Sequence, residues 1–176
     1  KALNGEYGLK EVASIGITYQ MHGLVCIDRQ GKPLRDSIIW SDSRAVEYGA
    51  LAFKQIGKEK CLNRLLNSPG NFTATKMAWV KANEPEIFEH TYKFFLPGDY
   101  IAYKLTGDIS TTESGLSEQI LWDFTDNAPA GFVCEYFGIP ASYIPVHKPS
   151  LGVQCHTTMQ MEKEFGIPKG TPISYR

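Results

Sequence analysis

The chain has 176 residues, of which 43% are hydrophobic and 12% aromatic, and its formal net charge is -1. This composition is typical of a globular protein with one substantial core, and it excludes a disordered chain. The near-neutral charge favours neither nucleic acid nor an anionic membrane as a partner. No apolar run approaches the roughly twenty residues of a membrane span. The 4 widely separated cysteines are typical of reduced packing residues, which favours the cytoplasm.

Three apolar segments begin the predicted secondary structure. The run over residues 12–18 is typical of a buried strand, and a hairpin with arms at 24–27 and 34–40 is expected to follow it. Apolar residues then recur with helical spacing over 43–55, and Gly57 is expected to end that helix.

The next part of the chain is predicted to be helical. A short helix is expected over residues 59–66. Thr73 is expected to cap the following helix, because Phe72 and Met77 occupy the two positions of a hydrophobic staple. Pro85 either ends that helix or begins another, since proline is tolerated in the first turn of a helix and not in its interior.

Strand and helix signals then alternate. A short strand is expected at 94–96, followed by a helix that begins at Pro97 and ends at a left-handed Gly107. Residues 108–117 are polar and small, and they are expected to be extended and partly a loop. Residues 120–122 predict another short strand.

The last third predicts two more helices and a terminal strand. Aromatic residues with helical spacing indicate a helix closed by Gly138, and a second helix is expected over 157–165. Residues 172–176 look like a strand that has just begun. The alternation of strands and helices predicts an α/β fold. Since a parallel strand needs neighbours on both sides, the abrupt ends predict that the chain is an internal piece of a larger protein.

Polar side chains follow the two apolar runs at residues 20–23 and 40–44. In open α/β sheets the carboxyl ends of strands bind small polar ligands. The imidazole of His22 is able to bond a sugar hydroxyl or carbonyl, with Met21 shaping the pocket. Trp40 is either a wall against the sugar or a core residue, and His22 equally fits a hydrogen-bonded structural role.

Two further residues are candidates for the same site. Asp42 either lines the sugar site or forms a weak surface ion pair with Arg44. Asn71, just before the helix with the staple, is either a substrate contact or a turn residue.

Other reactive side chains carry less weight. Asp99 invites a catalytic role, but a carboxylate in the first turn of a helix is already explained by the helix dipole. Asp123 lies in a polar segment and is expected to be solvated. His147, Cys155 and His156 do not have the spacing of a metal site, so no metal ligands are predicted.

Three sequence segments resemble one known family. The segment 14–23, which contains Gln-Met-His-Gly, resembles the sugar-binding turn of the FGGY carbohydrate kinase family, in its xylulokinase branch. The segment 70–80 resembles the N-terminal signature helix of that family, and 96–107 resembles its next block. Their order and spacing match from about Val12 to the end of the chain.

The resemblance implies a fold and a domain. Residues 1–176 would form most of the N-terminal domain of a two-domain sugar kinase, with part of an actin-like (ribonuclease H-like) α/β ATPase fold. The family binds ATP with an Asp-Gly-Thr-Thr loop in its first strand, which this sequence lacks. Its catalytic Asp is expected just after Arg176. The chain therefore contains no catalytic residue by this reading, and alone it is expected to be inactive.

The resemblance also implies a reaction: ATP-dependent phosphorylation of a ketopentose, D-xylulose to D-xylulose 5-phosphate. Met21, His22, Trp40, Asp42 and Asn71 would bind the sugar, while ATP and Mg²⁺ would be bound largely outside this chain. The Met-His pair favours xylulokinase over glycerol kinases, which carry Arg-Glu there. Expected partners are the sugar and the remainder of the kinase polypeptide, and a homodimer is left open. The alternatives are a ribulokinase-like or gluconokinase-like enzyme, or a non-catalytic sugar-binding domain.

Overall fold

The structure is a computed structural model that describes residues 8–175. Its helices are η1 Leu9–Glu11, α2 Val46–Ile56, α3 Lys58–Arg64, α4 Thr73–Asn83, α5 Pro85–His90, α6 Pro97–Thr106, α7 Glu113–Glu118, α8 Gly131–Phe137, η2 Ala141–Tyr143 and α9 Met159–Phe165. Its strands are β1 Ile15–Ile17, β2 Val25–Ile27, β3 Lys93–Phe95, β4 Ser110–Thr112, β5 Trp122–Asp123, β6 Ala128–Pro129, β7 Val146–Lys148, β8 Cys155–His156 and β9 Pro172–Tyr175.

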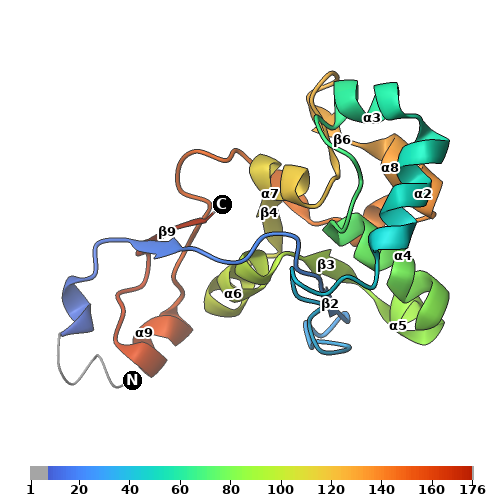
Figure 1. The fold of residues 1–176 in the computed structure, drawn as a ribbon. Coiled ribbons are helices and arrows are strands. Elements are labelled where there is room, and N and C mark those ends of the chain that lie inside the picture. Colours follow the sequence, from blue (N-terminus) through green and yellow to red (C-terminus); the bar gives the residue numbers. More distant parts are fainter. Residues whose placement is uncertain (1–7, 176) are drawn as a thin grey trace.

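The strands form one sheet of three and three pairs. In the sheet, with order β1-β9-β8, β1 runs parallel to β9 and β8 runs antiparallel to it. The pairs are β2 with β3, β4 with β7, and β5 with β6. Figure 1 shows α6 between the part that holds β1, β9 and α9 and the part that holds α2, α3, α4, α5 and α8. Of the described helices, none has the length and apolar character needed to cross a membrane.

Two apolar clusters correspond to these two parts. The larger lies among α2, α4 and α8 and includes Met77, Phe94 and Leu116, all fully buried. The smaller joins Ile173 of β9 to Ala102 of α6. Because α6 belongs to the smaller cluster and also follows β3, it connects the sheet to the rest of the domain.

Local signals placed most of the helices correctly. The α/β class is confirmed, and helices occur at each place where they were expected. Pro97 begins α6, and Gly107 ends it in the left-handed region with φ 75°. Gly138 likewise follows α8 with φ 61°. Pro85 begins α5. All four cysteines are free and buried, as expected of packing residues. The terminal strand is β9, and Arg176 lies outside the described residues.

Two expectations, one about a strand and one about a helix cap, were wrong. The arm at 34–40 is not a strand: its bridge from Ile38 to Leu24 is isolated, as is that of Pro33 just before the arm, while β2 pairs with β3. Thr73 is not a cap, because the chain enters α4 through Phe72. The Thr73 hydroxyl instead donates to the Gly23 carbonyl, 3.1 Å away, which ties the helix to a distant turn.

Three further differences concern burial and secondary structure. The first strand was expected to be buried, but Gly16 is exposed and its neighbours are half-buried, because among the described residues β1 pairs only with β9. The polar segment 108–117 contains β4 and most of α7, whose start is capped when the Thr112 hydroxyl accepts from the Gly115 N–H. Asp123 is buried rather than solvated, since Arg64 donates to it at 2.7 Å.

A prediction follows from the contact between α2 and the loop before α4. A methyl group on Gly49 would lie 1.8 Å from the Gly70 carbonyl oxygen, and a backbone atom is unable to move aside as a flexible side chain would. We expect Gly49→Ala to lower the free energy of unfolding by about 1–3 kcal/mol, as overpacking does. Urea denaturation measures the change.

The matched control is Gly131→Ala, since Gly131 begins α8 and a methyl group there meets nothing within 4 Å. That variant should stay within about 0.5 kcal/mol of the native chain. Equal stabilities of the two variants would contradict the close approach of α2 to Gly70.

Candidate functional site

His22 stands in a left-handed backbone conformation, with φ 61°, on the turn that follows β1. Its Nδ1 lies 2.9 Å from the Glu118 carbonyl oxygen and 3.4 Å from the Glu118 carboxylate. Its ring packs on Phe72, with 4.1 Å between centroids. Because a carbonyl only accepts, Nδ1 must donate in this bond. Among residues 8–175 no hydrogen bond reaches Nε2. In the neutral form of the ring, Nε2 is then the nitrogen that accepts a hydrogen bond.

Helix α4 binds the main chain of this turn through two side chains. Lys76 is fully buried, and its Nζ donates to the His22 carbonyl at 2.6 Å. Thr73 holds the next carbonyl, that of Gly23. On the other side, a methyl group on Gly23 would lie 2.6 Å from the ring of Pro97. Burial lowers the pKa of Lys76 to about 8, partly opposed by the charge of Asp42. The turn is thus fixed between α4 and α6.

The loop before α2 carries a rigid charge pair. Arg44 donates to both carboxylate oxygens of Asp42, at 2.9 and 2.7 Å. This hydrogen bonding lowers the pKa of Asp42 to about 2, so the carboxylate is charged at neutral pH. The Arg44 guanidinium also lies over the Trp79 ring of α4, 4.5 Å from its centroid. The pair therefore braces its own loop against α4.

Two side-chain amides join the loops to each other. The Asn71 amide donates to the Asp42 carbonyl at 2.7 Å and lies 3.4 Å from that of Trp40. The Gln20 side chain accepts from the Trp40 N–H at 2.8 Å. Trp40 is 60% exposed and Met21 is 52% exposed. Trp40 is therefore not a core residue, and both side chains are open to a ligand.

Gln20 thus joins the loops at residues 20–23 and 40–44, but the five predicted site residues do not share one pocket. A shallow pocket of about 270 Å³ is lined by Met21 and His22, together with Phe72 and parts of α7. Trp40, Asp42 and Asn71 do not line it. The structure brings the two loops together through hydrogen bonds and places only the Met-His pair at this concave surface.

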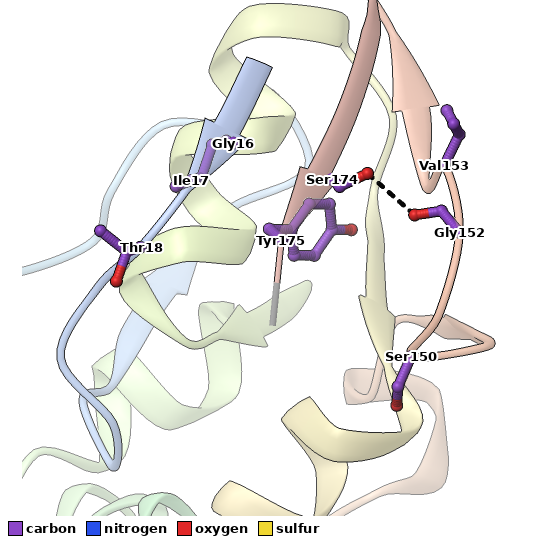
Figure 2. A pocket seen from close by; sticks show the side chains of 8 residues that line it. All are labelled: Gly16, Ile17, Thr18, Ser150, Gly152, Val153, Ser174 and Tyr175. Atoms are coloured by element: carbon purple, nitrogen blue, oxygen red, sulfur yellow. Dashed lines mark hydrogen bonds between the residues drawn. The ribbon is translucent and has the colours of Figure 1, made fainter. Parts of the chain in front are cut away.

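A second pocket lies where β1 and β9 end. Figure 2 shows Ile17 at the end of β1, Thr18 just after it, Tyr175 at the end of β9, and the loop 150–153 facing them. The pocket has a volume of about 740 Å³, and the hydroxyl of Ser174 donates to the carbonyl of Gly152 across it at 2.8 Å. Parallel strand ends are a common place for ligands in α/β sheets. The sequence analysis did not include this loop, because its proline-rich neighbourhood indicated only a connection.

Asp99 has a structural role. It is fully buried, and one carboxylate oxygen accepts from the Leu96 N–H and the Thr111 hydroxyl, at 3.2 and 2.9 Å. Burial raises its pKa to about 7, although the bond from Thr111 opposes the shift. The carboxylate thus joins the start of α6 to β4. Within the described part of the chain, His147, Cys155 and His156 belong to no cluster of three or more metal-ligating side chains.

Sequence reasoning missed Lys76 and Glu118, which fix His22. Glu118 could not be recognised from its residue type, because it is its main-chain carbonyl that binds His22. Lys76 did give one: with Thr73, Met77 and Val80 it follows the 3-4-7 spacing of the buried face of α4, and all four are buried. A lysine on an apolar face indicates a buried partner.

The N-terminal domain of the FGGY family of carbohydrate kinases matches residues 2–175. The chain therefore belongs to this family, as its sequence segments suggested. It is 37% identical to the xylulose kinase of Staphylococcus xylosus over 131 residues, which are 72% of this chain and 26% of that protein. The chain spans about a quarter of the length of the curated relatives it matches.

Solved structures show the same fold. A kinase from Brucella ovis, described as a xyloylose kinase, superposes with a TM-score of 0.89 at 23% identity, covering 98% of this chain and 36% of that one. A gluconate kinase from Lactobacillus acidophilus gives 0.82 at 20% identity, covering 93% and 34%. The fold is therefore that of FGGY sugar kinases, and it does not by itself distinguish their substrates.

The buried carboxyl of Asp99 generates a prediction about pH. Its pKa is about 7 in the folded chain against an ordinary 3.8, so the folded state keeps a proton that the unfolded state releases. Its contribution to stability is present below about pH 4 and is lost as the pH rises through about 7. Asp99→Asn should remove this decline, which is on the order of a few kcal/mol, from urea unfolding measured between about pH 4 and pH 8.

Asp123→Asn is the control, because the Asp123 carboxyl is expected to change the stability with pH in the opposite direction. Burial alone would raise the pKa of Asp123, but hydrogen bonds from Arg64 and two backbone N–H groups outweigh it and lower the pKa. That carboxylate adds stability above about pH 4, which is lost as the pH falls. An unchanged pH slope in Asp99→Asn would show that Asp99 is ionised in the folded chain at neutral pH.

Proposed function

We propose that this chain positions the acceptor sugar in an ATP-dependent kinase that converts D-xylulose to D-xylulose 5-phosphate. The observation that carries the proposal is the imidazole of His22, which is held through Nδ1 and lines a concave surface beside Met21. The relatives that share 34–37% identity with this chain over most of its length are named xylulose kinases.

The chemistry of the turn suits a keto sugar. Nδ1 of His22 is already engaged with Glu118, so Nε2 accepts a hydrogen bond from a sugar hydroxyl. Trp40 does not line the pocket of His22, but its exposed side chain on the adjoining loop is proposed as an apolar wall for the C–H side of the sugar. Holding the acceptor in line with a phosphoryl group lowers the barrier by several kcal/mol without covalent chemistry from these residues. Asp42 and Asn71 act by bracing the Trp40 loop.

ATP and Mg²⁺ belong to the same proposal. The transferred group comes from ATP, and a divalent ion neutralises the charge of its phosphates. The described residues include no group of three or more side chains able to hold a metal ion, so this part of the chain does not fit an ion held by protein ligands alone. The acceptor-binding role of His22 does not depend on that ion. Reduced, buried cysteines support a cytoplasmic enzyme.

The alternative within the family is a gluconokinase-like or ribulokinase-like substrate. The gluconate kinase of Lactobacillus acidophilus has the same fold in this region, with a TM-score of 0.82. What favours the ketopentose is the Met21-His22 pair itself and the names of the relatives of higher identity. A panel of ketopentoses and gluconate, tested with the complete kinase polypeptide, separates these substrates.

The prediction concerns Nε2 of His22. His22→Asn keeps an amide near the position of Nδ1, and asparagine tolerates the left-handed backbone, but the variant has no atom at Nε2. One lost hydrogen bond to a buried sugar group costs about 1–3 kcal/mol, so kcat/KM for D-xylulose should fall roughly tenfold to a hundredfold. The KM for MgATP and the melting temperature should change little.

His90→Asn is the matched control, because Nδ1 of His90 also lies near a carbonyl, that of Glu86 at 2.8 Å, but on α5. It should leave the sugar kinetics unchanged. If His22→Asn keeps the native kcat/KM for D-xylulose, the proposed contact is wrong and the histidine has a purely structural role.

A further inference from the structure

We propose that Lys76 is a positioning residue for the acceptor sugar: it fixes the carbonyl of His22 and so sets the direction in which Nε2 points. The inference rests on the proposed function of His22. It adds to the sugar site a buried residue that touches no substrate.

The burial of Lys76 is the first observation. Lysine is almost never fully buried unless its ammonium is paired, yet Lys76 has no exposed surface. In the described part of the chain no carboxylate forms an ion pair with it, and its hydrogen bond goes to the His22 carbonyl at 2.6 Å. An apolar side chain would fill this space at a lower desolvation cost. The ammonium is therefore best explained by the carbonyl that it holds.

The conformation of His22 is the second observation. A residue with a side chain costs free energy at φ 61°, and it keeps that backbone only where its surroundings hold it there. Lys76 and Thr73 lie three positions apart on one face of α4 and bind two consecutive carbonyls, those of His22 and Gly23. The two bonds together fix the peptide plane after His22. Without the ammonium, the His22 carbonyl loses its donor and the residue is free to relax.

The third observation connects the backbone to the imidazole. The bond from Nδ1 to the Glu118 carbonyl and the packing on Phe72 both require the Cα–Cβ direction that the left-handed backbone gives. A rotation at His22 would break the Nδ1 bond and move the imidazole, which lines the pocket. Lys76 thus acts on the sugar through His22, while the apolar core beneath it stays filled.

The same helix offers a matched control. Lys81, five residues further along α4, donates to the carbonyls of Phe137 and Gly138 at 3.1 and 3.0 Å. It has the same chemistry, a lysine ammonium on main-chain carbonyls, but it holds the end of α8 instead of the turn.

The experiment compares Lys76→Met and Lys81→Met in the complete kinase polypeptide, alone and combined with His22→Asn. Lys76→Met should lower kcat/KM for D-xylulose by about tenfold or more, mainly through KM for the sugar, with KM for MgATP within about twofold. Lys81→Met should stay within about threefold of the native enzyme. In the His22→Asn background, Lys76→Met should add less than about threefold, because the two residues act as one unit.

A measurement that needs no sugar tests the positioning role of Lys76 separately from the proposed function. The rate at which diethyl pyrocarbonate modifies His22, followed by mass spectrometry, should change in Lys76→Met and not in Lys81→Met. If both rates match the native rate, or if the effects of Lys76→Met and His22→Asn simply add, the positioning role is wrong even when D-xylulose is the substrate. If the rate changes but the kinase does not use D-xylulose, the proposed function fails and the positioning of His22 stands.

Folding is checked by thermal denaturation. If Lys76→Met does not fold, Lys76→Gln, which keeps a donor of shorter reach, takes its place. Should neither variant fold, the inference is overturned, because Lys76 would then be required by the core and not by the turn.

Discussion

A buried ammonium holds one carbonyl of a left-handed turn, and the rest of the candidate site depends on that bond. Nζ of Lys76 lies 2.6 Å from the oxygen of His22, and the following residue, Gly23, is wedged against Pro97. Leu24 then begins the pairing with Ile38 that leads into β2. Between β1 and β2 the chain passes between Thr73 and Lys76 of α4 and Pro97 of α6. The turn therefore sets both the path of the chain and the orientation of the imidazole.

The same helix supports the second loop. Asn71, at the entrance to α4, binds the carbonyls at 40 and 42, and Trp79 lies under the guanidinium of Arg44. Two loops that are twenty residues apart in the sequence are thus held by one rigid element. A site that acts by positioning needs this kind of support, since a small displacement of an acceptor hydroxyl is costly for the transfer step. The charge of Asp42 also offsets part of the cost of burying Lys76, which links the two loops electrostatically.

The backbone preferences of single residues were sufficient to predict the helices, but they were insufficient to predict the candidate site. Prolines at 85 and 97 and glycines at 107 and 138 act through their own backbone preferences, so their roles were readable from the sequence. Thr73 was misread because its hydroxyl bonds to a distant partner, the carbonyl of Gly23. The 34–40 arm does meet its expected partner at 24–27, but only through isolated contacts, and the regular pairing of β2 is with β3. His22 and Met21 were singled out by their place after a predicted strand, and the family resemblance implied that they bind a sugar. Lys76 was overlooked, although its place on the apolar face of α4 was a readable signal.

The most direct test of this account is the protonation of the His22 ring, read from ¹⁵N chemical shifts of labelled histidine in the complete kinase, with His22→Asn to assign the signals. The account predicts a neutral ring with the proton on Nδ1, bonded to Glu118, and an Nε2 resonance that shifts when D-xylulose is added. A proton on Nε2, or an Nε2 resonance that stays in place at saturating sugar, would contradict it.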